Sequence, residues 1–231
     1  MSFASIDHRL CFIHIPKAGG SSISEALKKS VPSIEKQHHL GTNDYRWSGS
    51  GHHTIYDYKE EFGRLPDWSF AVIRNPYERC VSAFMVHPDY GKKYHLLGAD
   101  EKRMFHEWEK YLIFCERWNN EQRGQIYLPN RVTSLSALGP NVQGPAIHAL
   151  PASYLITINS RIAVNTLIGM RDIDKVPELV RRHTGYQMFN LLHENKSDSA
   201  QYMNLLLTND CKKVIERVYK EDFELYERAH E

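Results

Sequence analysis

Two copies of one pattern constrain the fold most: a short apolar run that leads straight into a polar turn and then into a helical pattern. The first run is "RLCFIHI" at residues 9–15, and the second is "WSFAVI" at residues 68–73. Both are rich in β-branched and aromatic residues, which is typical of strands buried in a parallel sheet. We therefore expect two strand–turn–helix units.

The helix of the first unit is marked by signals at both of its ends. "SSISEALKKS" at residues 21–30 begins with small polar residues suited to capping, and it ends in lysines, which are favoured in a last helical turn. Ile23, Ala26 and Leu27 recur at helical spacing.

The helix of the second unit begins in "RNPYER". Asn75 is a candidate cap, Pro76 suits the first helical position, and Glu78 stands three residues after Asn75, as in a capping box. The helical periodicity places Glu78, Arg79 and Ser82 off the core face.

The remainder of the chain continues this alternation. Residues 31–51 and 123–151 carry scattered Gly and Pro, so we expect a loop in the first stretch and mostly loop with short helices in the second. Runs at 153–158 and 165–170 predict two more strands. Helical patterns occupy 54–63, 100–118, 174–183, 197–207 and a C-terminal stretch from 209. Such alternation predicts an α/β fold with a central, mainly parallel sheet flanked by helices.

The bulk composition limits the class of protein. Of the 231 residues, 42% are hydrophobic, which is enough for a sizeable core, so we expect residues 1–231 to form a single domain. The formal net charge of +1 does not favour a nucleic-acid partner. The four cysteines form no C-x-x-C pair, so neither a disulfide framework nor a zinc ribbon is indicated.

The chain also lacks the pattern of a membrane span. A span needs about 18 consecutive apolar residues, and no stretch of the sequence reaches that length. The start, "MSFASIDHRL", does not have the pattern of a secretory leader. We therefore expect a cytoplasmic protein.

The first polar turn, "PKAGGSS", has the composition of an anion site. Gly19 and Gly20 allow close approach of the backbone, Ser21 and Ser22 add hydroxyl donors, and Lys17 supplies a cation. Anions collect at helix N-termini that follow the strands of such sheets. The alternative is a Gly-rich helix start with a solvated lysine.

The order of residues in this turn separates it from a nucleoside triphosphate P-loop. In G-x-x-x-x-G-K-[ST] the lysine follows the glycines and directly precedes Ser or Thr. Here Lys17 comes before both glycines. A kinase or NTPase is therefore an alternative that the turn does not favour.

The second turn offers another candidate anion site. Arg74 at the strand end can grip a phosphate in a bidentate manner, and Ser82 lies two turns along the helix. The alternatives are an ordinary ion pair for Arg74 and a solvent-facing position for Ser82.

Together "HIPKAGGSS" and "VIRNPYERCVSAF" resemble the sulfotransferase superfamily. The pair is most similar to its glycan-modifying branch, which includes heparan sulfate 2-O- and chondroitin sulfotransferases. The resemblance implies a P-loop-like three-layer fold and the donor 3′-phosphoadenosine 5′-phosphosulfate, with adenosine 3′,5′-bisphosphate as product. It implies that Lys17 and the backbone from Ala18 to Ser22 hold the phosphosulfate, and that Arg74 and Ser82 hold the 3′-phosphate.

Weaker similarity extends through "HALPASYLITINSRIAVNTLIGMRDID" and the later "HENKSD". The family pattern departs at Ala152, where relatives usually have glutamine, and at "MRD" (170–172), where they have Arg-Phe-Glu. By the match to "HENKSD", Asn195, Lys196 and Ser197 are candidate nucleotide contacts.

The catalytic base is also suggested by the resemblance. Sulfuryl transfer to an alcohol needs a base for the hydroxyl proton, and histidine suits that task near neutral pH. In heparan sulfate 2-O-sulfotransferases a Gly-His before a helix similar to that in "GHHTIYDY" carries the base, and this resemblance makes His52 the candidate and His53 the fallback. A metal site from His38, His39 and these two histidines is disfavoured, because the i, i+4 spacing is absent. We expect metal-free, in-line transfer.

The identity of the acceptor is open at this stage. The resemblance favours a glycan or glycolipid hydroxyl, and a small alcohol or a peptide tyrosine remains an alternative. The lack of a membrane anchor suggests a bacterial or phage-type enzyme. A non-catalytic module that binds the nucleotide or a sulfated glycan is the alternative outside enzymes.

Overall fold

The computed structural model describes residues 2–32, 52–92, 100–126, 145–189, 191 and 198–230. The loop expected at 31–51 lies outside these ranges beyond residue 32. So do Asn195, Lys196 and Ser197, and so do His38 and His39.

A four-stranded sheet forms the centre of the molecule, in the order β1-β2-β3-β6. Strand β2 (Leu10–Ile13) pairs in parallel with β3 (Trp68–Ile73), which pairs in parallel with β6 (Thr166–Gly169). The short edge strand β1 (Phe3–Ala4) is antiparallel to β2. Every residue of β2 and β3 is buried, as expected of strands with both faces covered. The predicted α/β fold with a mainly parallel sheet is confirmed.

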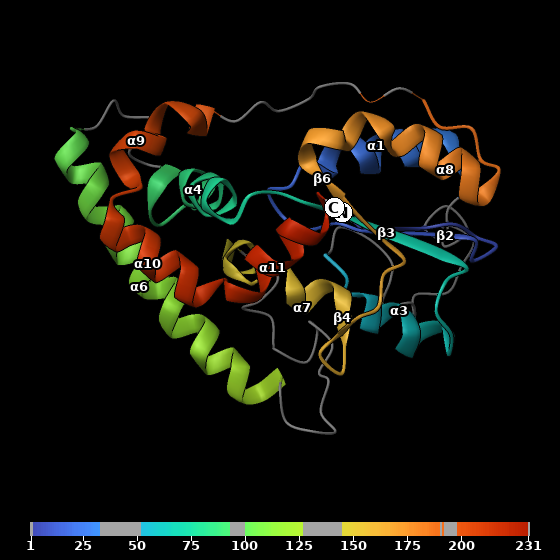
Figure 1. Ribbon diagram of the computed structural model, residues 1–231, viewed down its shortest axis with the longest axis horizontal. Coiled ribbons are helices and arrows are strands. Elements are labelled where there is room, and N and C mark those ends of the chain that lie inside the picture. Colours follow the sequence, from blue (N-terminus) through green and yellow to red (C-terminus); the bar gives the residue numbers. More distant parts are fainter. Residues whose placement is uncertain are drawn as a thin grey trace.

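Helices cover both faces of the sheet (Figure 1). On one face lie α1 (Gly20–Ser30) and α8 (Val176–Thr184), and on the other lie α3 (Ile55–Phe62) and the short α7 (Ser153–Ile156). Helix α3 begins with a reciprocal capping box, in which Thr54 and Asp57 bond each other's backbone N–H.

A second group of helices packs beside the sheet layers (Figure 1). It has its own hydrophobic cluster, centred on buried aromatic residues such as Trp108 and Tyr111. Its members are α4 (Pro76–Val86), α6 (Glu101–Ile126), α9 (Met203–Leu206) and α10 (Asn209–Val218), with the 3₁₀ segments Pro145–Ala149 and Asp198–Tyr202. The last helix, α11 (Lys220–Arg228), contributes to the cluster around the sheet through Leu225.

Three sequence predictions of secondary structure were wrong in part. Residues 153–156 form α7 rather than a strand; only Thr157–Ile158 is extended, as β4, and it turns at once into β5 (Arg161–Ile162) through two residues with positive φ. Helix α6 continues to residue 126, into a stretch expected to be mostly loop. The C-terminal pattern is divided into α10 and α11 at Tyr219.

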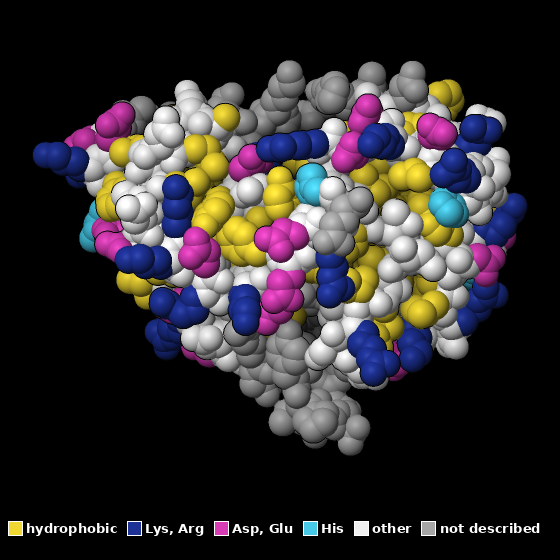
Figure 2. All heavy atoms as spheres, viewed as in Figure 1, with side chains coloured by type: hydrophobic (Ala, Val, Ile, Leu, Met, Phe, Trp, Pro, Cys, Tyr) yellow, Lys and Arg dark blue, Asp and Glu magenta, His cyan; other side chains and the backbone are white. Residues whose placement is uncertain are grey.

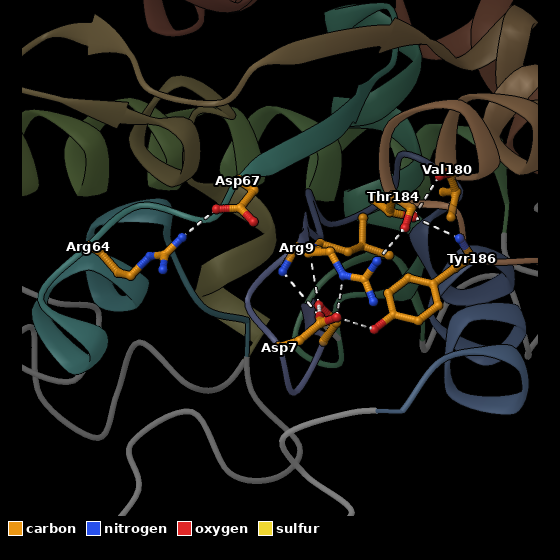
Figure 3. Close-up of polar contacts among 9 residues, drawn as sticks. Asp7, Arg9, Arg64, Asp67, Val180, Thr184 and Tyr186 are labelled. Carbon is orange, nitrogen blue, oxygen red and sulfur yellow. Dashed lines mark hydrogen bonds and ion pairs between the residues drawn. The ribbon is translucent and has the colours of Figure 1, made fainter.

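A separate polar cluster joins the segment before β2 to the end of α8 (Figure 3). Asp7 pairs with Arg9 and accepts a hydrogen bond from the Tyr186 hydroxyl at 2.7 Å. Arg9 also donates to the carbonyl of Thr184, at the end of α8. Burial alone would raise the pKa of Asp7, but the hydrogen bonds from Tyr186, Arg9 and Ser5 lower it below its ordinary value. This cluster therefore stabilises the fold at a distance from the turns.

Candidate active site

The first polar turn has the backbone geometry of a tight anion-binding loop. Lys17 and Gly19 both adopt left-handed conformations, with φ of +66° and +75°, and α1 begins directly afterwards at Gly20. A left-handed φ is uncommon for a lysine and concentrates at functional sites. The turn thereby places a cation beside the N-terminus of an 11-residue helix.

The N-termini of α1 and α4 differ in a way that bears on anion binding. Within the described ranges, no side chain caps α1, and its first turn contains no acidic residue. Helix α4 is capped by Asn75, which accepts from the N–H groups of Tyr77 and Glu78, and Glu78 adds a negative charge there. The start of α1 therefore presents a positive helix end with neither an N-cap side chain nor an acidic residue, whereas the start of α4 has both.

Arg74 links the two turns. Its Nη1 donates to the carbonyl of Lys17 at 3.3 Å, and its Nε donates to Glu78 at 3.1 Å. The ion pair that the sequence left as an alternative is thus present, yet it uses only part of the five-donor guanidinium. Burial, and then the charge of Arg74, lowers the pKa of Lys17 from its ordinary value.

The prediction that Arg79 and Ser82 lie off the core face was wrong. Both are buried, with 2% and 0% of their surface exposed, because α4 packs against α9, α10, α11 and the two 3₁₀ segments. Arg79 is compensated by Asp222, with 2.9 Å between Nη2 and Oδ2. As a ligand for the 3′-phosphate, Ser82 remains a prediction.

His52 lies next to the first turn and is held there by the end of β2. Its Nδ1 is 3.1 Å from the carbonyl oxygen of His14, and the two rings are 4.7 Å apart. Because a carbonyl only accepts, Nδ1 carries the proton and Nε2 carries the lone pair. Burial lowers the pKa of His52 to about 4, so the ring is neutral at pH 7.

The backbone around His52 is fixed by the hydroxyl of Ser2. This hydroxyl donates to the carbonyl of His53 at 3.0 Å and accepts from the N–H groups of His14 and His53 at 3.1 and 3.3 Å. Burial lowers the pKa of His53 to about 4 as well. Of the two histidines, His52 is the one whose ring lies against His14, which favours it as the base.

Two histidines of this region were missed by the sequence reasoning. His14 belongs to the first apolar run, and its ring lies directly over Gly20. His148 comes from the Pro145–Ala149 segment, in a stretch expected to be mostly loop, and its ring is perpendicular to that of His52 at 5.9 Å. The position of His14 directly before "IPKAGG" was a signal that could have been used, whereas His148 had none.

The structure also bears on metal binding, membrane crossing and surface charge. The described residues contain no cluster of three or more His, Cys, Asp or Glu side chains with the geometry of a metal site. Among the same residues, no helix is both long and apolar enough to cross a membrane. Acidic and basic side chains intermingle on the face shown in Figure 2.

The lysine turn and the start of α1 follow strand β2 of the parallel sheet, and His52 is hydrogen-bonded to the same segment. A family model described as "Sulfotransferase family" matches residues 2–227, and the chain belongs to this family. Searches of the curated proteins and of the solved structures each found no match. The chain is therefore a transferase of the sulfotransferase class.

Proposed function

We propose that the enzyme moves the sulfuryl group of 3′-phosphoadenosine 5′-phosphosulfate to a hydroxyl acceptor, with His52 as the general base. One observation carries this proposal. The His14 carbonyl that orients His52 and the turn that would bind the donor belong to one short backbone segment, from His14 to Gly20. The base and the anion site are therefore held in a fixed relation.

The first turn fits the phosphosulfate end of the donor. The N-cap residue of α1 is Gly19, which has no side chain, and a positive helix end favours an anion. Lys17 lies beside them and is partly buried, which strengthens its electrostatic effect. We assign binding of the phosphosulfate to Lys17, to the backbone from Ala18 to Gly20, and to Ser21 and Ser22.

In the proposed reaction, His52 acts through its Nε2 lone pair. It takes the proton of the acceptor hydroxyl as the new sulfur–oxygen bond forms, and the electrons of the breaking bond go to the phosphate oxygen of the leaving group. Lys17 and the start of α1 stabilise the charge that develops there. No covalent intermediate with the protein is required.

Arg74 is the residue proposed for the 3′-phosphate. Its contact with the Lys17 carbonyl ties the second turn to the first, so that both phosphate groups of one nucleotide would meet connected elements. The hydrogen bonds of Arg74 to described residues use Nε and Nη1, which leaves N–H groups with which to bind a phosphate. Ser82 is proposed with it from the family resemblance.

For the acceptor, we propose a carbohydrate hydroxyl, on the family resemblance to the glycan-modifying branch. We also infer that the chain acts as one sulfotransferase domain, since the family match extends over residues 2–227.

The experiment is incubation with radiolabelled donor and a panel of acceptors. The panel contains desulfated heparin and chondroitin oligosaccharides, a glycolipid, and a phenol, and products are read by mass spectrometry. A gain of one sulfuryl group on an oligosaccharide or glycolipid supports the proposal. Transfer to the phenol alone rejects the carbohydrate acceptor, and no transfer to any acceptor rejects the activity.

Two variants tie the activity to the site. Lys17→Ala and His52→Ala should each lower transfer by at least about 100-fold, the usual size of an electrostatic or general-base contribution. Lys29→Ala, at the exposed end of α1, is the control and should retain activity. Tighter binding of ATP with Mg²⁺ than of adenosine 3′,5′-bisphosphate, measured by calorimetry, would instead indicate a kinase or NTPase.

A further inference from the structure

Among the histidines of the site, His148 has an unusual environment. Its ring points edge to face toward His52, with centroids 5.9 Å apart and planes at 90°. The Nδ1 atom is buried and has no hydrogen-bond partner within the described part of the chain. His148 therefore lies close to the proposed base with one ring nitrogen unpaired, which bears on its protonation and on its role.

The unpaired Nδ1 indicates which nitrogen of His148 carries the proton. Burying an N–H group without a partner costs more than burying a lone pair on a neutral ring. The proton therefore lies on Nε2, which becomes a hydrogen-bond donor. His52 has the opposite tautomer, because its Nδ1–H bonds the His14 carbonyl and its Nε2 is free to accept. Nε2 of His148 is therefore a hydrogen-bond donor, and Nε2 of His52 is a hydrogen-bond acceptor.

The electrostatic environment of His148 favours its neutral form. Burial lowers the pKa of His148 to about 4, and the positive charge of Lys17 acts in the same direction. A neutral donor at this position can bond an anionic group without adding a positive charge to that of Lys17.

The carbonyl groups that follow His148 are held by buried side chains. The carbonyl of Ala149 accepts from Asn119 at 3.1 Å and from the Tyr219 hydroxyl at 2.8 Å. The carbonyl of Leu150 accepts from Arg79 at 2.9 Å. The donors come from α6, from the junction of α10 and α11, and from α4, so that separate elements fix the residues directly after His148.

The next part of the same segment is fixed by a carboxylate. Asp222 accepts from the N–H groups of Ala152 and Ser153 at 2.8 and 3.0 Å, and it also pairs with Arg79. Hydrogen bonds to buried charged groups are among the stronger ones in proteins. Such anchoring is the support that a precisely placed catalytic side chain needs.

We propose that His148 is a second catalytic residue, whose Nε2–H donates a hydrogen bond to a non-bridging oxygen of the sulfuryl group during transfer. The proposal rests on the proposed function. In an in-line transfer the acceptor oxygen that His52 deprotonates becomes bound to the sulfur, so the sulfuryl group lies beside His52. The His148 ring, 5.9 Å from that of His52, is placed to reach a non-bridging oxygen of this group. His148 gives up no proton: His52 receives the hydroxyl proton, and the leaving phosphate oxygen receives the electron pair.

The test compares two replacements of His148. Glutamine keeps an N–H donor at a similar reach, whereas phenylalanine keeps the ring shape without a donor. We expect His148→Phe to lower kcat by about 100-fold, as for the loss of one oxyanion-hole donor, and His148→Gln to lie within about tenfold of the wild type. Binding of adenosine 3′,5′-bisphosphate, measured by calorimetry, should change by less than about twofold in both. His106→Phe, on the exposed face of α6, is the matched control.

The tautomer supplies a readout that does not depend on turnover. Long-range proton–nitrogen NMR of the histidine rings in the full chain should show His148 protonated at Nε2 and His52 at Nδ1, with adenosine 3′,5′-bisphosphate bound. Protonation of His148 at Nδ1, or equal kcat for the Phe and Gln variants, overturns the proposal. Failure of the wild type to transfer any sulfuryl group would instead overturn the proposed function, and this role with it.

Discussion

The ring of His14 lies so close to Gly20 that a Cβ atom on the glycine would be 2.2 Å from His14 Cδ2. Gly20→Ala must therefore displace the ring, and with it the residue whose carbonyl orients His52. We expect a loss of stability of about 1–3 kcal/mol from overpacking and a fall in kcat of at least tenfold. Urea unfolding and the transfer assay measure the two effects.

Gly185→Ala is the control for this change. Gly185 ends α8 with a φ of +78°, and nothing lies within 4 Å of the position of its Cβ. An alanine there is strained by about 1 kcal/mol but contacts no site residue. Full activity in Gly20→Ala would show that His14 does not need its present position.

Because Lys17 has a left-handed φ, two replacements can distinguish the effect of its charge from the effect of its backbone strain. Lys17→Ala and Lys17→Gly both remove the ammonium group, so transfer should fall by at least about 100-fold in each. Only glycine adopts a φ of +66° without steric cost, so Lys17→Gly should be the more stable of the two, by up to about 1 kcal/mol. Thermal unfolding compares them, and a more stable alanine variant would contradict the strain.

Local patterns accounted for most of the fold, because the signals for β2, β3 and the starts of α3 and α4 lie within a few residues. The sequence also predicted that Lys17, His52 and Arg74 belong to one site, and the structure places Arg74 in contact with the carbonyl of Lys17. It did not reveal the burial of Arg79, whose partner Asp222 is 143 residues away. Helical periodicity identifies one apolar face, and it fails for a helix such as α4 that packs against several elements.

His148 could not be predicted for a similar reason. Its segment is short, irregular in sequence and placed by contacts from Asn119, Arg79 and Tyr219, which are distant in the chain. The strand assigned to 153–158 was wrong because apolar runs of this length do not distinguish a strand from a buried helical turn.

The activity should persist well below the pH at which a free histidine becomes charged. A general base works in its neutral form, and burial lowers the pKa of His52 to about 4. We therefore expect kcat/KM to fall only as the pH drops through about 4, rather than near 6.5, with transfer measured at a series of pH values. An inflection near 6.5 would show that His52 is more exposed in solution or that another group is the base.

The same histidines make the stability of the fold depend on pH. The pKa of His52, His53 and His148 is about 4 in the folded chain and 6.5 as the ordinary value, so the unfolded chain binds more protons between these limits. Their stabilising contribution is complete above pH 6.5 and is lost as the pH falls toward 4, by at most about 1.4 kcal/mol per pH unit for each group. Urea unfolding at pH 7 and pH 5 measures the loss, which His148→Gln should reduce. An unchanged loss in that variant would contradict the burial of the ring.

The buried pair of Arg79 and Asp222 should be among the most sensitive contacts of the fold. Asp222→Ala leaves the guanidinium unpaired and two backbone N–H groups without an acceptor, at a cost of about 3–5 kcal/mol. Arg79→Met should cost less, because those N–H groups still bond Asp222. The double variant should be more stable than Asp222→Ala alone, since no unpaired cation remains buried.

Urea unfolding of the two single variants and the double variant measures this coupling, with Glu121→Ala as the control. Glu121 pairs with Arg117 on the exposed surface of α6, with side chains 53% and 82% exposed, so its loss should cost less than about 1 kcal/mol. Because the buried pair also anchors the segment that follows His148, Asp222→Ala should lower kcat even at temperatures where the chain is fully folded. If the losses of unfolding free energy add up in the double variant, the two side chains stabilise the fold independently. If folded Asp222→Ala has the kcat of the wild type, the pair is not needed to position His148.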